Sequence, residues 1–201
     1  TVPLNLDSYE SVFVVFAEPG KAGKSPKVGS VTNYPSPALL TEISGPWNVS
    51  FDQKMRGPVN PVVMPRLQPW NEMPNDSVKY YSGTAVYTTG FDLVKLPANE
   101  RILLDLGKLS AMGKVYVNGQ YAGGVWTTPY ELDITQWVKE GRNDLRVEVV
   151  NTWVNRLIGD SRLPASQRRT WTVVNPWRPN SPLQTSGLLG PVRVTAVAYE
   201  Q

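Results

Sequence analysis

The chain has 201 residues, a formal net charge of +3, and neither histidine nor cysteine. These two absences exclude Ser-His-Asp triads, histidine general bases, disulfides, thiolate nucleophiles and zinc fingers. The charge is too balanced for the basic stripe of a nucleic-acid-binding protein, and no apolar run approaches the length of about 18 residues that spans a membrane. Charged residues make up only 18% and aromatic residues 10%, alongside 16 glycines and 18 prolines, which favours an all-β protein that contacts neutral, hydroxylated ligands or other protein.

The first part of the chain predicts one strand and a linker. Residues 11–17 form an apolar run that ends at the turn signal Glu18-Pro19-Gly20, a pattern typical of a buried strand. The following lysines, glycines and prolines show no sustained period and predict a linker. A lone strand before a linker is unusual at the start of a domain. We therefore expect residues 1–18 to end a preceding β-domain, 19–41 to be the linker and 42–201 to be the main domain.

Beyond the linker, short alternating segments separated by turns predict strands. Residues 82–93 are rich in Thr, Val, Tyr and Phe, residues 144–150 alternate strictly, and Asn118-Gly119 favours a two-residue type I′ hairpin. Residues 55–76, with five prolines, and residues 151–186 predict long irregular loops. Further strands are expected at 47–51, 101–106, 114–118, 120–122, 129–134 and 191–199, with a helical turn at 135–139 and a turn at 141–143. With no long amphipathic helix, the pattern predicts an all-β fold, a β-sandwich or jelly roll with long irregular loops.

Three aspartates are candidates for catalysis, because hydrolases without histidine use pairs of carboxylates. The sequence context favours a structural role for each: Asp105 in a turn, Asp133 as a cap that accepts from the Thr135 and Gln136 amides, and Asp160 in an ion pair with Arg156. No acid and nucleophile pair stands out. The chain also lacks EF-hand spacing, so we expect no required cofactor, and a structural Ca²⁺ between loops is an alternative without defined ligands.

The loop at 151–186 combines several tryptophans with several arginines. Aromatic rings stack on the apolar faces of sugars, and Arg and Asn side chains hydrogen-bond their hydroxyls, so this composition suits carbohydrate. The alternative is that the tryptophans pin a long loop to the sandwich or fill a contact with a neighbouring domain. The candidate carbohydrate-binding residues are Trp126, Tyr130, Trp153, Asn155, Arg156, Trp171 and Trp177.

A series of motifs carries a family resemblance. It comprises Gly45-Pro46-Trp47, residues 82–87, Leu104-Asp105-Leu106-Gly107, residues 115–119, residues 126–130 with Asp133, and residues 141–143. In this order they resemble the galactose-binding-type jelly roll of the glycoside hydrolase family 2 sugar-binding domain. Residues 153–160 and 186–192 are in addition similar to the C-terminal domain of bacterial α-L-rhamnosidases of the family 106 type.

The resemblance covers about residues 43–199 and implies an accessory domain of a polysaccharide-degrading enzyme, often periplasmic or secreted. The catalytic carboxylates of such enzymes lie on a separate barrel domain of the same polypeptide, so the resemblance implies that this chain is not catalytic by itself. The implied partners are that barrel and plant or bacterial glycans with neutral or deoxy sugars, not nucleic acid or membrane.

Three hypotheses follow from the sequence. The first is a non-catalytic accessory domain of an α-L-rhamnosidase-like glycoside hydrolase, which recognises carbohydrate or supports the catalytic domain. The second is a purely structural interdomain module, with the aromatics of loops 55–76 and 151–186 facing the catalytic domain. The third is a self-sufficient hydrolase that uses Asp or Glu.

Overall fold

The strands of this chain pair antiparallel into two facing sheets. The computed structural model describes residues 6, 11–13 and 36–198. The strands within these ranges are β1 (Ala38–Glu42), β2 (Trp47–Phe51), β3 (Val62–Met64), β4 (Thr84–Leu93), β5 (Glu100–Asp105), β6 (Lys108–Leu109), β7 (Met112–Val117), β8 (Gln120–Val125), β9 (Glu131–Asp133), β10 (Gly141–Val150), β11 (Leu188–Gly190) and β12 (Arg193–Ala198). The helices are η1 (Gln53–Met55), η2 (Trp70–Glu72), α1 (Asp76–Lys79), α2 (Val154–Ser161) and η3 (Ala165–Gln167).

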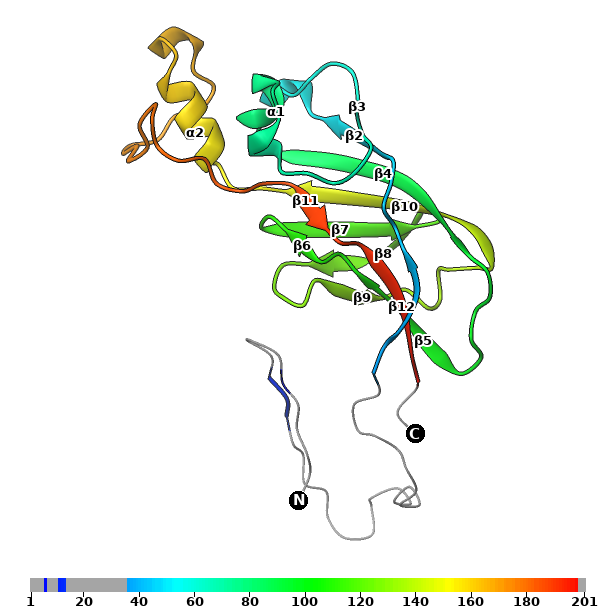
Figure 1. Ribbon diagram of the computed structural model, residues 1–201. Helices are drawn as coiled ribbons and strands as arrows, with labels where there is room; N and C mark the ends of the chain where they lie inside the picture. The colour runs from blue at the N-terminus through cyan, green and yellow to red at the C-terminus, as the bar shows by residue number, and fades with distance from the viewer. Residues whose placement is uncertain (1–5, 7–10, 14–35, 199–201) are drawn as a thin grey trace.

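The two sheets form a β-sandwich, as predicted. One sheet has the order β3-β2-β4-β10-β7-β8 and the other the order β1-β12-β5-β9, while β6 and β11 form a short separate pair. Figure 1 shows the sheets stacked, with α1 beside β2 and β3 at one end and α2 standing away from the strands. Buried side chains of both sheets form one apolar cluster between them, so the predicted all-β class and sandwich architecture are confirmed.

The predicted alternation decides which face of each strand is buried. In β2, Trp47, Val49 and Phe51 are buried while the residues between them are exposed. In β10 the side chains of Leu145 and Val147 are likewise buried, because successive residues of a strand point to opposite faces. One face of each strand therefore builds the core, and the other forms the outer surface of the sandwich.

The hairpin between β7 and β8 is also confirmed. Asn118 and Gly119 both have positive φ angles, 50° and 81°, as a type I′ turn requires. The Asn118 side chain accepts a hydrogen bond from the Asp144 amide at 3.0 Å and donates one to the Trp137 carbonyl at 2.8 Å. The turn is thus fastened to the segments on both sides of it.

An aromatic cluster holds the irregular segments against the core. Trp70 is fully buried, lies edge-on to Phe51 and Tyr81, and stacks on Tyr87 at 6.3 Å between ring centroids. Its Nε1 donates to the Tyr87 hydroxyl at 2.5 Å, and the Leu188 amide donates to the same hydroxyl at 3.1 Å. Burial raises the pKa of Tyr87 well above that of an ordinary phenol. Trp70 therefore pins the loop at 55–76 to the sandwich. It does not face a neighbouring domain, which corrects the second hypothesis for the aromatic residue of this loop.

Replacing Gly187 by alanine is expected to lower the free energy of unfolding by about 2 kcal/mol or more. Gly187 has a φ of 102°, and an added Cβ would lie 2.7 Å from Trp70 Nε1 and 2.9 Å from the Tyr87 hydroxyl. Gly119→Ala is the matched control, since Gly119 also has a positive φ but nothing within 4 Å of an added Cβ. Urea unfolding of both variants measures the two free energies of unfolding. An equal loss of stability in the two variants would contradict a clash at Gly187.

The structure corrects several predictions about segments. Residues 55–76 are not wholly irregular, because they contain β3, η2 and the start of α1, which begins after the last of the five prolines. Residues 151–186 contain the helix α2, whose Asn155 and Gly159 are poor helix formers that tertiary contacts stabilise. The expected turn at 141–143 forms the first residues of β10. The single helical turn expected at 135–139 is present at residues 135–137, where the amides of Trp137 and Val138 both donate to the Ile134 carbonyl, at 3.0 and 3.3 Å.

The N-terminal boundary also differs from the prediction. β1 begins at Ala38 and pairs with β12, so the last residues of the expected 19–41 linker belong to the sandwich. Of the strand expected at 11–17, residues 11–13 are exposed and form no strand, and the rest lies outside the described residues.

Candidate functional site

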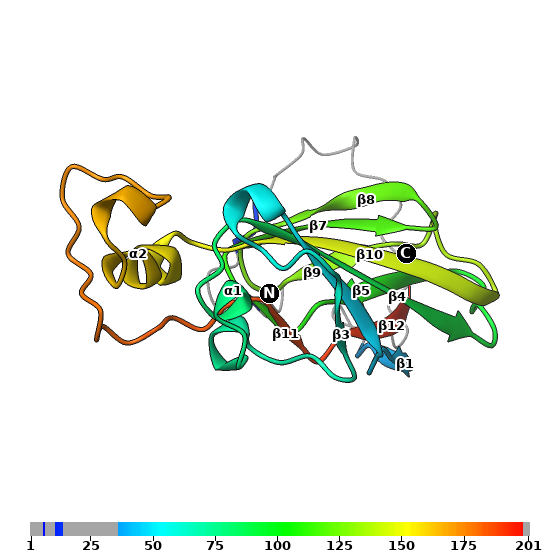
Figure 2. The same ribbon diagram turned by 90° about the horizontal axis from the view of Figure 1, so that it is seen from above.

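An arm projects from one end of the sandwich. It comprises residues 153–186, and Figure 2 shows its helix α2 and the chain that follows extending away from both sheets. The buried side chain of Asn155 joins its two ends: Nδ2 donates to the Gln184 carbonyl at 2.7 Å, and the Gln184 amide donates to Oδ1 at 2.8 Å. The Arg156 amide donates to Ser82 Oγ at 3.2 Å, which fastens the helix to the sandwich.

Asp160 organises the interior of the arm. Its Oδ2 accepts hydrogen bonds from the amides of Arg169 and Thr170 and from Thr170 Oγ1, each at 2.8 Å, while its Oδ1 lies 3.3 Å from Arg156 Nε. Burial alone would raise the pKa of Asp160, but these hydrogen bonds and the Arg156 charge hold it below its ordinary value. Burial lowers the pKa of Arg156, and the Asp160 charge opposes that shift. The carboxylate therefore has a structural role.

The tip of the arm exposes apolar side chains. Trp171, Val173 and Val174 are 82%, 86% and 76% exposed. Beside Trp171 lies a hollow of about 310 Å³, which Arg168, Arg169 and Asn175 also line. The arm carries five arginines and one acidic residue. Its surface thus combines exposed apolar groups with a surplus of positive charge.

The seven predicted carbohydrate-binding residues do not form one site. Trp153, Asn155, Arg156, Trp171 and Trp177 lie in the arm, whereas Trp126 and Tyr130 lie on the sandwich. Within the arm, Trp153 is half-exposed and Trp177 partly buried, but Asn155 and Arg156 are only 2% and 6% exposed and are engaged in the contacts above. On the sandwich, Trp126 is 70% exposed, while Tyr130 packs against the core. Asn155 and Arg156 therefore hold the arm together in this structure.

The three aspartates have the structural roles predicted for them, with Thr135 but not Gln136 among the donors to Asp133. Asp105 Oδ1 accepts from the Gly107 amide at 2.7 Å, and Asp133 Oδ1 accepts from the Thr135 amide at 3.0 Å and its hydroxyl at 2.5 Å. With Asp160 ion-paired, each of the three is engaged by separate donors, which removes the support for an acid and nucleophile pair among them.

Neither a metal site nor a membrane-spanning helix is found in the part of the chain that the structure describes. Residues 6, 11–13 and 36–198 contain no cluster of three or more His, Cys, Asp or Glu side chains that could hold a metal ion. Over the same ranges no helix is both long and apolar enough to cross a membrane. The structural Ca²⁺ remains a prediction without assigned ligands.

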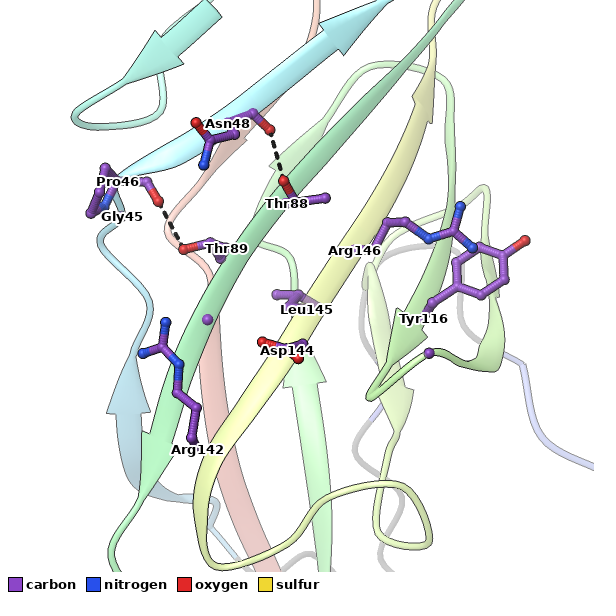
Figure 3. Close-up of a pocket in the computed structure, with 12 residues that line it drawn as sticks. Gly45, Pro46, Asn48, Thr88, Thr89, Tyr116, Arg142, Asp144, Leu145 and Arg146 are labelled. Atoms are coloured by element: carbon purple, nitrogen blue, oxygen red, sulfur yellow. Dashed lines mark hydrogen bonds between the residues drawn. The ribbon is translucent and has the colours of Figure 1, made fainter. Parts of the chain in front are cut away.

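A second surface, which the sequence reasoning missed, lies on the outer face of the six-stranded sheet. A hollow of about 650 Å³ is lined from β2, β4, β7 and β10. Figure 3 shows Arg142, Asp144 and Arg146 along β10, with the Arg146 guanidinium over the Tyr116 ring. The signal that could have found it is the run of outward polar residues in β10, which alternates with the core residues already used to predict the strand.

The known proteins that resemble this chain are named as glucuronidases and a rhamnosidase. A protein of Formosa agariphila whose name assigns it as a beta-glucuronidase is 34% identical over an alignment 193 positions long, which covers 84% of this chain and 16% of that protein. The structure of a rhamnosidase from Novosphingobium sp. PP1Y matches with a TM-score of 0.76 and 36% identity, over 83% of this chain and 16% of that one. A β-D-glucuronidase of Dictyoglomus thermophilum shares the fold, with a TM-score of 0.54 and 19% identity over 84% of this chain and 29% of that one.

The chain therefore spans about a sixth of the length of the first two of these relatives. The family profile described as "Glycosyl hydrolases family 2, sugar binding domain" matches residues 50–178, which is more than half of the chain. This chain belongs to the sugar-binding domain family of the family 2 glycosyl hydrolases.

Proposed function

We propose that this chain is a non-catalytic accessory domain of a large rhamnosidase-like glycoside hydrolase, and that its arm packs against the catalytic domain of the same polypeptide. The observation that carries the proposal is the exposed apolar tip of the arm, Trp171, Val173 and Val174. Exposed apolar groups of this size mark interaction surfaces, and the relatives extend far beyond the segment that this chain matches.

The internal bonds of the arm support a docking role. Asp160 and Asn155 hold the arm in one conformation before any partner binds, so docking costs little conformational entropy. With five arginines and one aspartate, the arm fits an acidic face on its partner. The enzyme would act on plant or bacterial glycans with neutral or deoxy sugars. We propose a periplasmic or secreted location for it, because such polymers are met there.

Trp171→Ala tests the docking of the arm. In the full-length enzyme it is expected to weaken the contact between domains by about 2 kcal/mol and to lower the thermal midpoint, because buried tryptophans dominate interfaces. In the 201-residue chain the same change is expected to alter the free energy of unfolding by less than about 0.5 kcal/mol, since the side chain is 82% exposed. Calorimetry of both proteins gives the two values.

Val94→Ala is the matched control, because Val94 is 99% exposed but lies beyond the end of β4, outside the arm. It is expected to leave both proteins unchanged. An unchanged midpoint for Trp171→Ala in the full-length enzyme, equal to that of Val94→Ala, would contradict docking through the arm.

A second candidate function is direct contact between the arm and the glycan. The hollow beside Trp171 favours it, because Arg168, Arg169 and Asn175 offer hydrogen-bonding groups next to an exposed ring. In that case Trp171→Ala raises KM for the polysaccharide with little change in kcat or in the thermal midpoint. The same variant thus separates the two roles.

A further inference from the structure

The outer face of the six-stranded sheet carries a continuous row of side chains across five strands. The pairing places Asn48 opposite Thr88, Thr88 opposite Arg146, Arg146 opposite Tyr116, and Tyr116 opposite Tyr121. With adjacent strands about 4.8 Å apart, the row is about 19 Å long. It runs at right angles to the strands, and such a row can contact an extended ligand along its length.

The next row has a gap at Gly90. Gly90 lies opposite Asp144 and has no side chain, so another side chain can lie directly against the sheet backbone there. An added Cβ would lie 2.3 Å from Arg142 Nη2, which shows that the Arg142 guanidinium lies over this gap. The rim is fixed by Thr89, whose hydroxyl donates to the Pro46 carbonyl at 2.8 Å (Figure 3).

The two arginines of the hollow are held in place and keep N–H donors for a ligand. Arg142 Nη1 lies 3.3 Å from Asp92, and Arg146 Nη1 lies 2.5 Å from Glu148. The Arg146 guanidinium also stacks on the Tyr116 ring at 3.6 Å from its centroid. A guanidinium has five N–H donors, so each arginine is positioned by one carboxylate and retains donors for a ligand.

An aromatic hollow adjoins the polar one on the same face. It measures about 240 Å³ and is lined by Tyr121, Trp126 and Glu148, among others. Tyr121 lies 5.3 Å from Tyr116 between ring centroids, and Glu148 contacts Arg146, so the two hollows share a border. Tyr121 and Trp126 are 54% and 70% exposed and leave ring surface open to a ligand.

The charges of the two hollows select the class of ligand. Along β10 the outward charged residues are Arg142, Asp144, Arg146 and Glu148, so the signs alternate and cancel, and Lys114 adds one positive charge beside the aromatic hollow. A strongly charged ligand would meet a like charge at every second position, whereas hydroxyl groups both donate to carboxylates and accept from guanidiniums. Exposed aromatic rings beside such groups suit the apolar faces of sugar rings.

We propose that these two adjoining hollows form one groove, which binds a short neutral oligosaccharide across the outer face of the six-stranded sheet. The groove is distinct from the arm. It places Trp126, a residue predicted to bind carbohydrate, beside polar side chains that the sequence did not indicate. The proposal rests on the proposed function, because it assumes that the polypeptide acts on glycans.

Gly90→Val and Trp126→Ala test the groove in the 201-residue chain. The Gly90 φ is not positive, so valine fits the strand and fills the gap by displacing the flexible end of Arg142. The probes are neutral rhamnose- and galactose-containing oligosaccharides, with a glucuronate-containing oligosaccharide as the charged comparison. Calorimetric titration and amide chemical shifts of isotope-labelled protein give affinity and position. We expect at least tenfold weaker binding for Gly90→Val and at least fivefold weaker binding for Trp126→Ala.

Ser50→Val is the matched control, since Ser50 is an exposed β2 residue on the same face that lines neither hollow. The affinity of this variant for the oligosaccharide is expected to stay within twofold of that of the native chain. In both proteins the amide chemical-shift changes on binding should centre on Thr88, Arg146 and Tyr116. The proposal is overturned if none of the neutral probes binds, or if Gly90→Val binds them as tightly as the native chain does. It is also overturned if the chemical-shift changes are confined to the arm, or if the glucuronate-containing probe binds more tightly than the neutral ones. None of these results affects the arm-docking test, which is made separately in the full-length enzyme.

Discussion

Replacing Trp70 by alanine is expected to lower the free energy of unfolding by about 3 to 5 kcal/mol, among the largest effects of any single substitution in the chain. The indole is fully buried among Phe51, Tyr81 and Tyr87, and its removal leaves a cavity between three rings. It also removes the donor of the 2.5 Å hydrogen bond to the buried Tyr87 hydroxyl. Urea unfolding followed by circular dichroism measures the loss.

Trp171→Ala in the same chain is the control for this measurement, because it deletes the same side chain from an exposed position. A loss below about 1 kcal/mol for Trp70→Ala would show that the loop at 55–76 is not anchored through this ring. The interpretation of the aromatic cluster as the anchor of that loop would then fail.

Replacing Asp160 by asparagine is expected to open the arm. The change keeps the size of the side chain but removes the charge that faces Arg156, and it leaves the buried Arg156 side chain without its counter-charge. Breaking a buried pair in this way costs about 3 kcal/mol. The loss should concentrate in the arm, so hydrogen–deuterium exchange at residues 169–171 is expected to accelerate while exchange in β10 stays slow.

Glu42→Gln provides the matched control, because Glu42 pairs with Arg193 at 3.1 Å on the exposed surface. Exposed pairs contribute less than about 1 kcal/mol, so no region should exchange faster in this variant. Equal exchange in the arm of Asp160→Asn and of the native chain would show that Asp160 does not organise it.

The same carboxylate predicts an acid-dependent opening of the arm. The pKa of Asp160 is lower in the folded state than the ordinary value of about 3.9 in an unfolded chain. Its contribution to stability is therefore fully present above about pH 4 and is lost as the pH falls through the folded-state pKa. Arm exchange in the native chain, corrected for the intrinsic pH effect, should accelerate below that pH, and in Asp160→Asn this added dependence should disappear.

Local patterns in the sequence predicted the strands and the roles of the aspartates. The period of two in β2 and β10 follows from the pleat of a single strand, and the Asn118-Gly119 turn needs only its own φ angles. The Arg156–Asp160 pair was predictable because the two residues lie four apart in the chain, although the helix that places them on one face was not predicted. These features depend on few neighbours in the chain, so a single sequence contains them.

Features made by distant segments were predicted poorly. The helix α2 contains Asn155 and Gly159, which favour other conformations, and the Asn155 contact with Gln184 across the arm supports it. The aromatic and arginine content of the loop did not distinguish exposed from buried positions, so Arg156 was predicted as a sugar contact although it is buried. The groove depends on the register of β2, β4, β7, β8 and β10, which no local pattern specifies.

Hydrogen–deuterium exchange of residues 171–174, compared between the 201-residue chain and the full-length enzyme, tests the central claim most directly. If the arm docks on the catalytic domain, these amides should exchange at least tenfold more slowly in the full-length enzyme, whereas the hairpin at Asn118-Gly119 should exchange equally in both. The same exchange rates at 171–174 in both proteins would contradict the docking of the arm and with it the supporting role proposed for this domain.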